Sequence, residues 1–272
     1  MLGWGLDGGG SVRIGIAEFS PVDGDTVANR ERAVHFIEEG AKRGVKLLVF
    51  PELSDVGYNL RLIQGMEVAA PNPFIDAIAN SAAGYGVGVL VGALEKEDGR
   101  LYNTAVAIGE GGRVVGRYRK MHLCSLPPFD EPSFFAPGNA VSVVDIGGLK
   151  VGMSICFDIR FPELYRLIAA EGAHVAVCLA AFPLVRIEEM IICARARAIE
   201  NQYFVLCANR IGRSGGVEFG GNSMVIGPDG RVITSFERED GILVAEIDPL
   251  EVGESRRKRP IFLARRVDIY GR

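Results

Sequence analysis

One cysteine stands at the junction between a predicted strand and a predicted helix. Cys156 follows the strand expected at Leu149–Ile155 and precedes the helix expected at Pro162–Ala170. Such a junction exposes a side chain at the carboxyl edge of a sheet, beside free backbone N–H groups, as in a nucleophile elbow. A thiol there can act as a nucleophile. The alternative is a buried cysteine that serves as a small hydrophobic side chain.

Three charged side chains are candidate partners for this thiol. Glu52 follows the apolar strand expected at Lys46–Phe50, and a carboxylate at such a place is either paired or functional. Lys120 shares the less charged face of the strand expected at Arg113–Lys120, where an ammonium group needs a partner. Glu131 lies in a loop rich in proline and phenylalanine. For each, the plainer alternative is a solvated side chain at a strand end or in a loop.

The sequence offers few ligands for a metal ion or a cofactor. It has three histidines, His35, His122 and His174, and neither a His-Glu-x-x-His nor a Cys-x-x-Cys pattern. It also lacks a Walker A sequence and a Gly-x-Gly-x-x-Gly turn after a strand. We therefore expect no metal and no cofactor. His122 could form a Cys–His pair with Cys156, but Glu52 can already serve as the base, so we expect a structural role for this histidine.

The composition is that of an ordinary globular protein. The 272 residues are 48% hydrophobic and 24% charged, which excludes intrinsic disorder. The net charge of −4 lacks the basic excess of a dedicated nucleic-acid binder. No apolar run approaches the ~20 residues that span a bilayer, and the first residues have no signal-peptide pattern. Because the 5 cysteines are odd in number and unpaired by spacing, we expect the reducing cytoplasm.

Helical and strand patterns mix along the whole chain without a linker rich in proline or glycine. We therefore expect one α/β domain in which two mixed sheets face each other with helices outside. Residues 1–11 are expected to form a flexible arm, residues 12–250 the domain, and residues 251–272 a basic tail without clear periodicity. The remaining expected strands are Val12–Phe19, Val87–Leu94, Leu101–Ile108, Val141–Ile146, His174–Ala181, Tyr203–Ala208, Asn222–Ile226, Val232–Phe236 and Ile242–Ile247, and the remaining expected helices are Val27–Arg43, Pro73–Ala83 and Ile187–Asn201.

Three separated motifs resemble those of the nitrilase superfamily of carbon–nitrogen hydrolases. They occur in the family's order, at family-like separations, and the resemblance covers about residues 12–250. It implies a four-layer α-β-β-α sandwich of two mixed sheets. The motifs are Val49–Leu53, Gly116–Leu123 and Gly152–Glu163, with supporting matches at Phe135–Asn139, Arg195–Asn201 and Gly221–Ser223.

The resemblance also implies roles for the candidate residues. The family's catalytic glutamate, lysine and cysteine fall on Glu52, Lys120 and Cys156, and its second glutamate falls on Glu131. The thiol would attack an amide carbonyl with Glu52 as general base, and a thioester would form and then be hydrolysed. Lys120 and the backbone N–H of Phe157 would stabilise the oxyanion, with Glu131 orienting Lys120. Family members usually form dimers, with the helix after the nucleophile and the C-terminal tail in the contact.

The residues after the nucleophile favour the amidase branches. Cys156-Phe157-Asp158 is nearer to their usual Cys-Tyr-Asp than to the Cys-Trp-Glu of nitrile-cleaving members. Residues 158–163 resemble the ω-amidases, which act on small α-keto acid amides, whereas residues 181–190 depart from that group. We expect hydrolysis of a small amide, with Tyr58 and Arg186 in substrate binding and Arg186 available to a substrate carboxylate.

The sequence is also compatible with other functions. Within the superfamily, the alternatives are an N-carbamoyl amide hydrolase and a nitrile hydrolase. The alternative of another class is a non-catalytic scaffold or nucleic-acid-binding protein that uses the basic run Arg256–Arg259. The acidic net charge argues against the last, so the expected partners are a small amide and a second copy of the chain, with no nucleic acid and no membrane.

Overall fold

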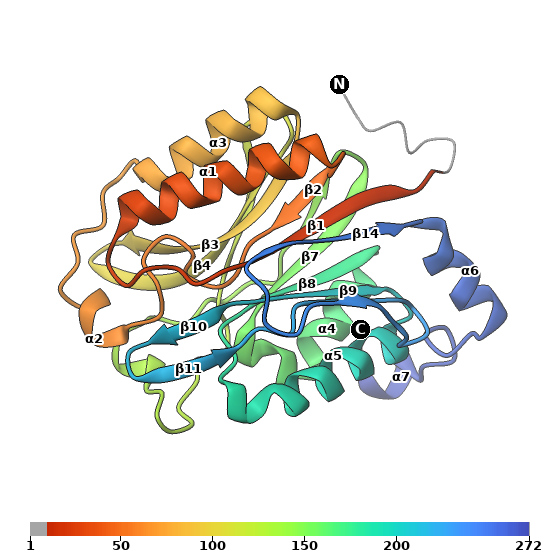
Figure 1. Ribbon diagram of the computed structural model, residues 1–272. Helices are drawn as coiled ribbons and strands as arrows, with labels where there is room; N and C mark the ends of the chain where they lie inside the picture. Colours follow the sequence, from red (N-terminus) through yellow and green to blue (C-terminus); the bar gives the residue numbers. More distant parts are fainter. Residues whose placement is uncertain (1–9, 272) are drawn as a thin grey trace.

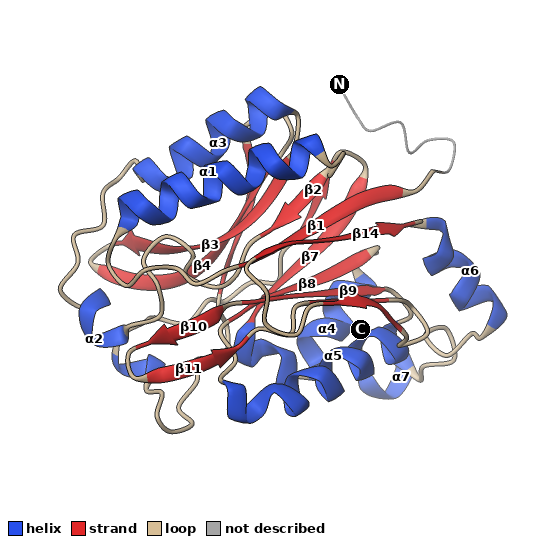
Figure 2. Cartoon of the chain, viewed as in Figure 1, coloured by secondary structure: helices blue, strands red, loops and turns tan. Residues whose placement is uncertain are grey.

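The structure is a computed structural model that describes residues 10–271. It consists of two facing six-stranded sheets with helices on their outer sides (Figures 1 and 2). The predicted α/β class and four-layer sandwich are therefore confirmed. Of the arm predicted for residues 1–11, only Gly10 and Ser11 fall within the described residues.

The first sheet has the strand order β14-β1-β2-β3-β4-β5. Neighbours β1, β2 and β3 run parallel and the other pairs run antiparallel, so the sheet is mixed. Helices α1 and α3 cover its outer face, and Asp25 and Asn72 cap their first turns. The bounds are β1 Val12–Glu18, α1 Thr26–Lys42, β2 Leu47–Val49, α3 Pro73–Tyr85, β3 Gly88–Glu97, β4 Arg100–Ile108, β5 Val114–Arg119 and β14 Gly241–Ile247.

The second sheet repeats this plan with the order β13-β12-β9-β8-β7-β6. Strands β7, β8 and β9 are parallel, and their outward side chains pack against α4 and α5. In Figure 2 these two helices lie below the sheets, opposite α1 and α3. The bounds are β6 Val143–Ile146, β7 Leu149–Ile155, α4 Pro162–Ala170, β8 Val175–Ala180, α5 Ile187–Asn201, β9 Phe204–Asn209, β12 Met224–Ile226 and β13 Val232–Ser235.

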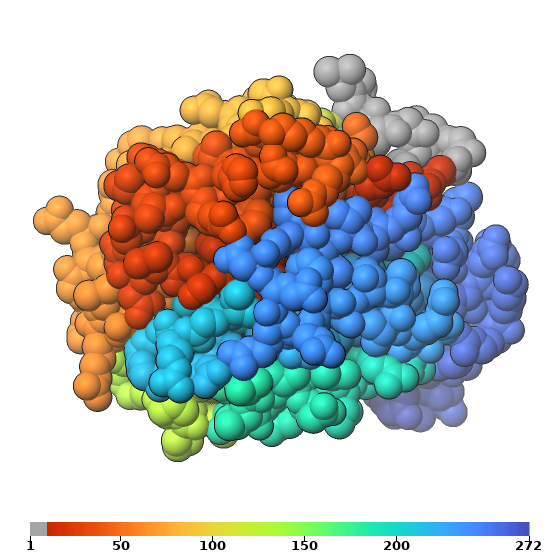
Figure 3. All heavy atoms as spheres, viewed as in Figure 1, coloured from red at the N-terminus to blue at the C-terminus, as the bar shows by residue number. Residues whose placement is uncertain are grey.

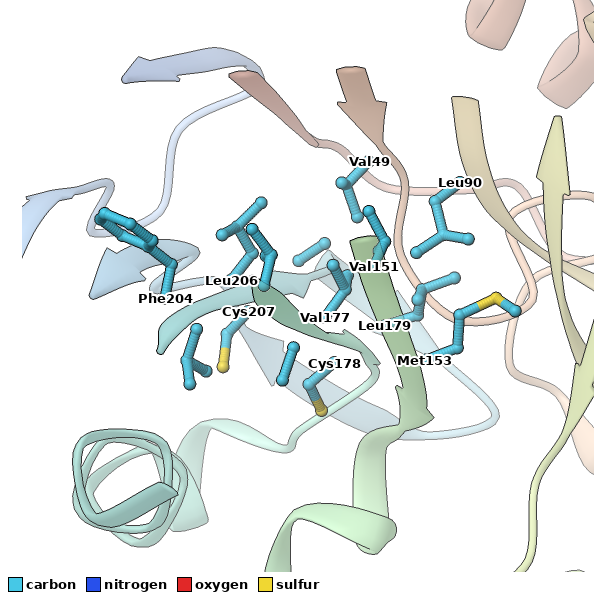
Figure 4. Close-up of a cluster of buried hydrophobic side chains, with 14 of the residues drawn as sticks. Val49, Leu90, Val151, Met153, Val177, Cys178, Leu179, Phe204, Leu206 and Cys207 are labelled. Carbon is cyan, nitrogen blue, oxygen red and sulfur yellow. The ribbon is translucent and has the colours of Figure 1, made fainter. Parts of the chain in front are cut away.

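The alternation of side chains along each strand builds the layers. Figure 4 shows Val49 and Leu90 of the first sheet facing Val177 of the second, whereas Cys178 and Cys207 point to the opposite side, toward the helices. All five side chains are fully buried. Burying an aliphatic side chain contributes ~1.5–3 kcal/mol. The facing sheets therefore form a rigid base for the loops at their edges.

Several elements have no counterpart in the sequence-based expectations. Near the site these are the short helix α2, Leu60–Ile63, and a hairpin of β10, Ile211–Ser214, with β11, Val217–Gly220. Beyond Pro249 the chain forms two helices, although its sequence there shows no clear periodicity: α6, Leu250–Lys258, and α7, Val267–Tyr270.

Tertiary contacts explain the helix α6. Val252 is buried in the main core, and the amide of Gln202 donates hydrogen bonds to the backbone oxygens of Ser255, at 3.0 Å, and Arg259, at 2.6 Å. A short helix with one buried apolar residue has too weak a pattern to be found without these contacts. None of the helices within residues 10–271 is long and apolar enough to cross a membrane.

Candidate active site

Strand ends from both sheets carry the predicted site residues. Glu52 lies three residues after β2, Lys120 directly follows β5, and Cys156 directly follows β7. The path of the Glu52 segment depends on Gly92 of β3, because a Cβ there would lie 2.5 Å from the backbone oxygen of Pro51 and 2.8 Å from the Cα of Glu52. Only glycine lets the two backbones approach so closely.

A lysine between two glutamates forms the centre of the site. The Nζ atom of Lys120 lies 2.7 Å from Oε1 of Glu52 and 2.7 Å from Oε1 of Glu131. All three side chains are fully buried. Buried charges are tolerated when they are paired and hydrogen-bonded, as here. The structure thus brings together three side chains that are 11 and 68 residues apart in the sequence.

Glu52 keeps one carboxylate oxygen free. Its Oε1 accepts hydrogen bonds from Lys120 and, at 2.7 Å, from the amide of Asn103, whereas its Oε2 has no partner among the described residues. Burial raises the pKa of Glu52, with Lys120 opposing and the charge of Glu131 adding to the rise. The carboxylate is therefore more basic than an exposed one and has a free lone pair for a proton.

Asn103 is a site residue that the sequence reasoning missed. It lies in β4, where it is fully buried, and its backbone oxygen accepts a hydrogen bond from the backbone N–H of Lys120 at 2.9 Å. Its side chain and main chain therefore hold both Glu52 and Lys120. An amide within the apolar strand expected at Leu101–Ile108 was the available signal, because a buried amide needs a polar partner.

Glu131 is held by hydrogen bonds on both oxygens. Besides Lys120, its Oε1 accepts from the hydroxyl of Tyr58, and its Oε2 accepts from the backbone N–H of Cys124 at 2.6 Å. Burial lowers the pKa of Lys120, but the negative charges of Glu131 and Glu52 outweigh burial and raise this pKa well above its usual value. Lys120 is therefore a fixed cation.

Cys156 occupies a strained position beside this cluster. It begins a short 3-10 turn, Cys156–Arg160, and its φ of 47° lies in the left-handed region. A non-glycine residue held there costs about 1–3 kcal/mol, and such residues concentrate at functional sites. Burial and the charge of Glu52 raise the pKa of the thiol, while Lys120 acts in the opposite direction. Because the pKa lies well above its usual value, the resting thiol is protonated.

A narrow pocket opens over the cysteine. Its lining includes Cys156, Phe157, Tyr58 and Arg186, so the structure places the remaining predicted residues around the same space. Arg186 donates a hydrogen bond to the backbone oxygen of Pro127 at 3.0 Å, and among the described residues no carboxylate lies within ion-pair distance of it.

A second cavity, of about 640 Å³, adjoins the narrow pocket and shares Tyr58 and Phe129 with it. It lies between α2, the loop near residue 130 and the hairpin of β10 and β11. These three segments meet at the left of the surface in Figure 3. No group of three or more His, Cys, Asp or Glu within residues 10–271 is arranged to hold a metal ion.

A four-layer sandwich with these side chains at one edge defines the class of nitrilase-type hydrolases. The model of the carbon-nitrogen hydrolase family matches residues 13–257. The 2-oxoglutaramate amidase of Bacillus subtilis is 34% identical over 258 residues, covering 94% of this chain and 98% of that protein. The chain therefore belongs to the carbon–nitrogen hydrolase family and is an enzyme of that family, which excludes the non-catalytic alternative.

Further relatives bear on the branch of the family. An omega-amidase of Homo sapiens is 30% identical, covering 93% of this chain and 94% of that protein. A nitrilase of Pyrococcus abyssi is 35% identical, covering 96% and 100%. Among solved structures, an amidase from Nesterenkonia sp. superposes with a TM-score of 0.86 at 24% identity, covering 95% of each chain, which supports the fold.

Proposed function

We propose that the chain hydrolyses the C–N bond of a small amide through a thioester on Cys156. The observation that carries this proposal is the free Oε2 of buried Glu52, in a carboxylate that is bonded to the fixed cation Lys120 and acts electrostatically on the Cys156 thiol. A base, a cation and a nucleophile in one buried cluster are the groups that acyl transfer needs.

The first half of the reaction forms the thioester. The sulfur of Cys156 attacks the carbonyl carbon as Glu52 takes the thiol proton, because the resting thiol is protonated. Lys120 and the backbone N–H of Phe157 stabilise the negative oxygen of the tetrahedral intermediate. Glu52 then gives its proton to the nitrogen, the C–N bond breaks, and ammonia leaves.

The second half returns the free enzyme. Water enters, Glu52 takes one of its protons, and the oxygen attacks the thioester carbon. Lys120 again stabilises the negative charge on the carbonyl oxygen, the C–S bond breaks, and the thiolate regains the proton from Glu52. Glu131 keeps Lys120 in place and charged through both halves, because it holds the ammonium group at 2.7 Å.

The substrate we propose is an ω-amide, a small amide that carries a carboxylate at its other end. The relatives named 2-oxoglutaramate amidase and omega-amidase support this class. Arg186 supplies a guanidinium group at the pocket of Cys156 that has no carboxylate partner within residues 10–271, and Tyr58 lines the same pocket. A guanidinium group binds a carboxylate in a bidentate manner.

Nitrile hydrolysis is the second candidate activity, because the Pyrococcus abyssi relative is named a nitrilase. The two are separated by incubating the enzyme with matched amides, N-carbamoyl compounds and nitriles. We expect ammonia from amides, no carbon dioxide and no turnover of nitriles. Faster formation of acid from nitriles than from amides would contradict the proposed amide preference.

The nucleophile is tested by mass spectrometry of the enzyme incubated with a panel of amides. We expect an acyl adduct on the peptide that contains Cys156. The Cys156→Ala variant should fold and release no ammonia, and Cys207→Ala is the matched control at a buried cysteine outside the pocket. Full activity in Cys156→Ala would remove Cys156 from its role.

We also propose that two copies pair through the C-terminal segment, as the resemblance implies, and through α5 rather than α4, the helix directly after the nucleophile. Apolar side chains are exposed on both: Ile192 is 65% exposed, Leu263 71% and Ile269 64%. Exposed apolar side chains that gather on neighbouring elements mark association surfaces. Sedimentation analysis should give a dimer, and Ile192→Asp with Leu263→Asp should give a monomer. A wild-type monomer at working concentration would contradict this.

The cytoplasm is the location we propose for the enzyme. Its five cysteines are free in the structure, and the proposed nucleophile must stay reduced to act. Fractionation of the source cells should recover the activity with other cytoplasmic enzymes. Recovery with an oxidising compartment would contradict the proposal.

A further inference from the structure

A buried carboxylate that has no role in the proposed chemistry joins the segments of Lys120 and Cys156. Asp158 is fully buried, two residues after the cysteine. Its Oδ2 accepts hydrogen bonds from the backbone N–H of Ile155 at 2.9 Å and from the hydroxyl of Tyr118 at 2.8 Å. Its Oδ1 accepts from the backbone N–H of His122 at 3.0 Å.

The imidazole of His122 completes this group. Its Nδ1 lies 2.7 Å from Oδ1 of Asp158, and its ring stacks on Phe161 with 3.7 Å between ring centres and 8° between ring planes. Phe161 in turn meets the ring of Phe157, the residue after the nucleophile, at 5.4 Å. One face of the imidazole and one of its nitrogens are therefore both in contact with the segment that follows Cys156.

The contacts of Asp158 lie close in sequence to both Lys120 and Cys156. Tyr118 and His122 stand two residues before and two residues after Lys120, and Ile155 stands directly before Cys156. The single carboxylate of Asp158 thus links the side chain of Tyr118 and the main chain of His122, on the two sides of the cation, to the main chain that presents the nucleophile. A fully satisfied buried network of this kind rigidifies the segments that it joins.

The hydrogen bonds of Asp158 also support the strained backbone of Cys156. A left-handed non-glycine residue persists only where its surroundings over-determine it, and the hydrogen bond from Ile155 to Asp158 closes the turn that contains it. Misplacing reacting groups by about 1 Å can cost ~100-fold in rate. The distance between the sulfur and the ammonium group is therefore the quantity that this link would control.

We propose that Asp158 and His122 are positioning residues that hold Cys156 and Lys120 in register for the reaction proposed above. Neither lines the pocket of Cys156. They act through the main chain, so their loss should lower the rate of the chemical step and leave substrate binding nearly unchanged. The proposal rests on the proposed function and adds two residues to it.

Three variants test the link at different points. Asp158→Asn keeps the size of the side chain, but every neighbour of the carboxylate is a donor or can donate, so the new NH₂ group must face a donor. His122→Ala removes the imidazole, and His122→Asn returns a donor close to the position of Nδ1. Tyr118→Phe removes one hydroxyl from the Lys120 side. The matched control is Tyr203→Phe, a buried tyrosine whose hydroxyl donates to the backbone oxygen of Tyr165 at 3.1 Å.

The readouts are kcat and KM for a good amide substrate, together with the thermal midpoint. We expect kcat to fall ~10- to 100-fold in Asp158→Asn and His122→Ala, less in Tyr118→Phe, with KM within ~3-fold of the original value. His122→Asn should recover most of the kcat that His122→Ala loses. Tyr203→Phe should keep kcat while its thermal midpoint falls.

Two results would overturn the proposal. One is an unchanged kcat in His122→Ala and Tyr118→Phe, which keeps the test valid even where Asp158→Asn does not fold. The other is a loss of kcat in the control Tyr203→Phe as large as in His122→Ala, because this would show a general effect of stability. Activity in Cys156→Ala would instead refute the proposed function, so the two failures are distinguishable.

Discussion

Replacing Glu131 by glutamine is the most revealing single change at the site. The wild-type cluster holds two carboxylates and one ammonium group, all fully buried. The glutamine has nearly the same shape but no charge. Each oxygen of Glu131 accepts from a donor: Oε1 from Lys120 and Tyr58, and Oε2 from the backbone N–H of Cys124. The NH₂ group must therefore point at a donor in either orientation.

The cost follows from these contacts. A buried donor left without an acceptor costs about 1–3 kcal/mol. Lys120 also loses one of its two ionic partners but keeps Glu52, so the loss stays below the 3–5 kcal/mol expected where a buried charge loses its only partner. We expect the variant to be about 1–3 kcal/mol less stable, and kcat to fall ~10- to 100-fold because Lys120 is no longer held at its place.

The pH dependence of kcat/KM tests the same variant, because the direction of its shift can be predicted. The charge of Glu131 raises the pKa of Glu52, so its removal lowers that pKa. Glu52 must be ionised to take the thiol proton, and the acidic limb of the kcat/KM profile should therefore move to lower pH. Stability is measured by urea unfolding and activity by ammonia release. The matched control is Glu218→Gln, a surface glutamate paired with Arg213 and Arg238, which should keep kcat.

An acidic limb that moves to higher pH in the Glu131 variant would refute the assignment of Glu52 as the base. Wild-type kcat together with wild-type stability would refute the role of Glu131 altogether. A fall in stability with an unchanged kcat would show that Glu131 serves only the fold.

Three further changes probe other parts of the molecule. Gly92→Ala places a Cβ against the backbone of Pro51, so it should cost about 1–3 kcal/mol of stability and reduce kcat. Urea unfolding measures the stability and ammonia release measures kcat. Unchanged values of both would contradict the close approach of the two backbones. Burial raises the pKa of Asp55 from 3.8 to about 7, so the folded state favours its protonated form and stability falls as the pH rises from 3.8 to about 7. Asp55→Asn keeps an oxygen that can accept from the N–H of Leu94. The variant should be more stable than wild type near pH 8, by at most about 4 kcal/mol, but not near pH 4. Equal unfolding midpoints of the two proteins near pH 8 would argue against a buried acid. Arg186→Met should raise KM ~10- to 100-fold for amides that carry a carboxylate and leave KM for acetamide unchanged, and an equal rise for both would exclude carboxylate recognition.

The strands that flank the site, and the strand face on which Lys120 lies, were predictable from the sequence. Alternation along β5 places Tyr118 with Lys120, and the structure buries Tyr118 between the two sheets as that alternation requires. The contacts of Asn103 and Asp158 were not predictable in the same way, because each partner belongs to another strand or turn. A short turn predicts that two consecutive strands pair, as β4 and β5 do, but the sequence does not indicate which distant segments become neighbours.

Residue types and their local order determined which side chains could react. A cysteine at the end of an apolar strand, a glutamate after another and a lysine at the end of a third define a possible nucleophile, base and cation before any fold is known. Local order also determined the layers, since the two-residue period of each strand decides which side chains face inward.

Only the tertiary structure decided how these groups behave. The ion pairs of Lys120 and the raised pKa values of Glu52 and Cys156 depend on burial and on distances between separate chain segments, with Glu52 and Lys120 68 residues apart. The C-terminal helix α6 likewise exists because Gln202 and the core hold it. Charge interactions and desolvation act through space, and for that reason they have no signature along the chain.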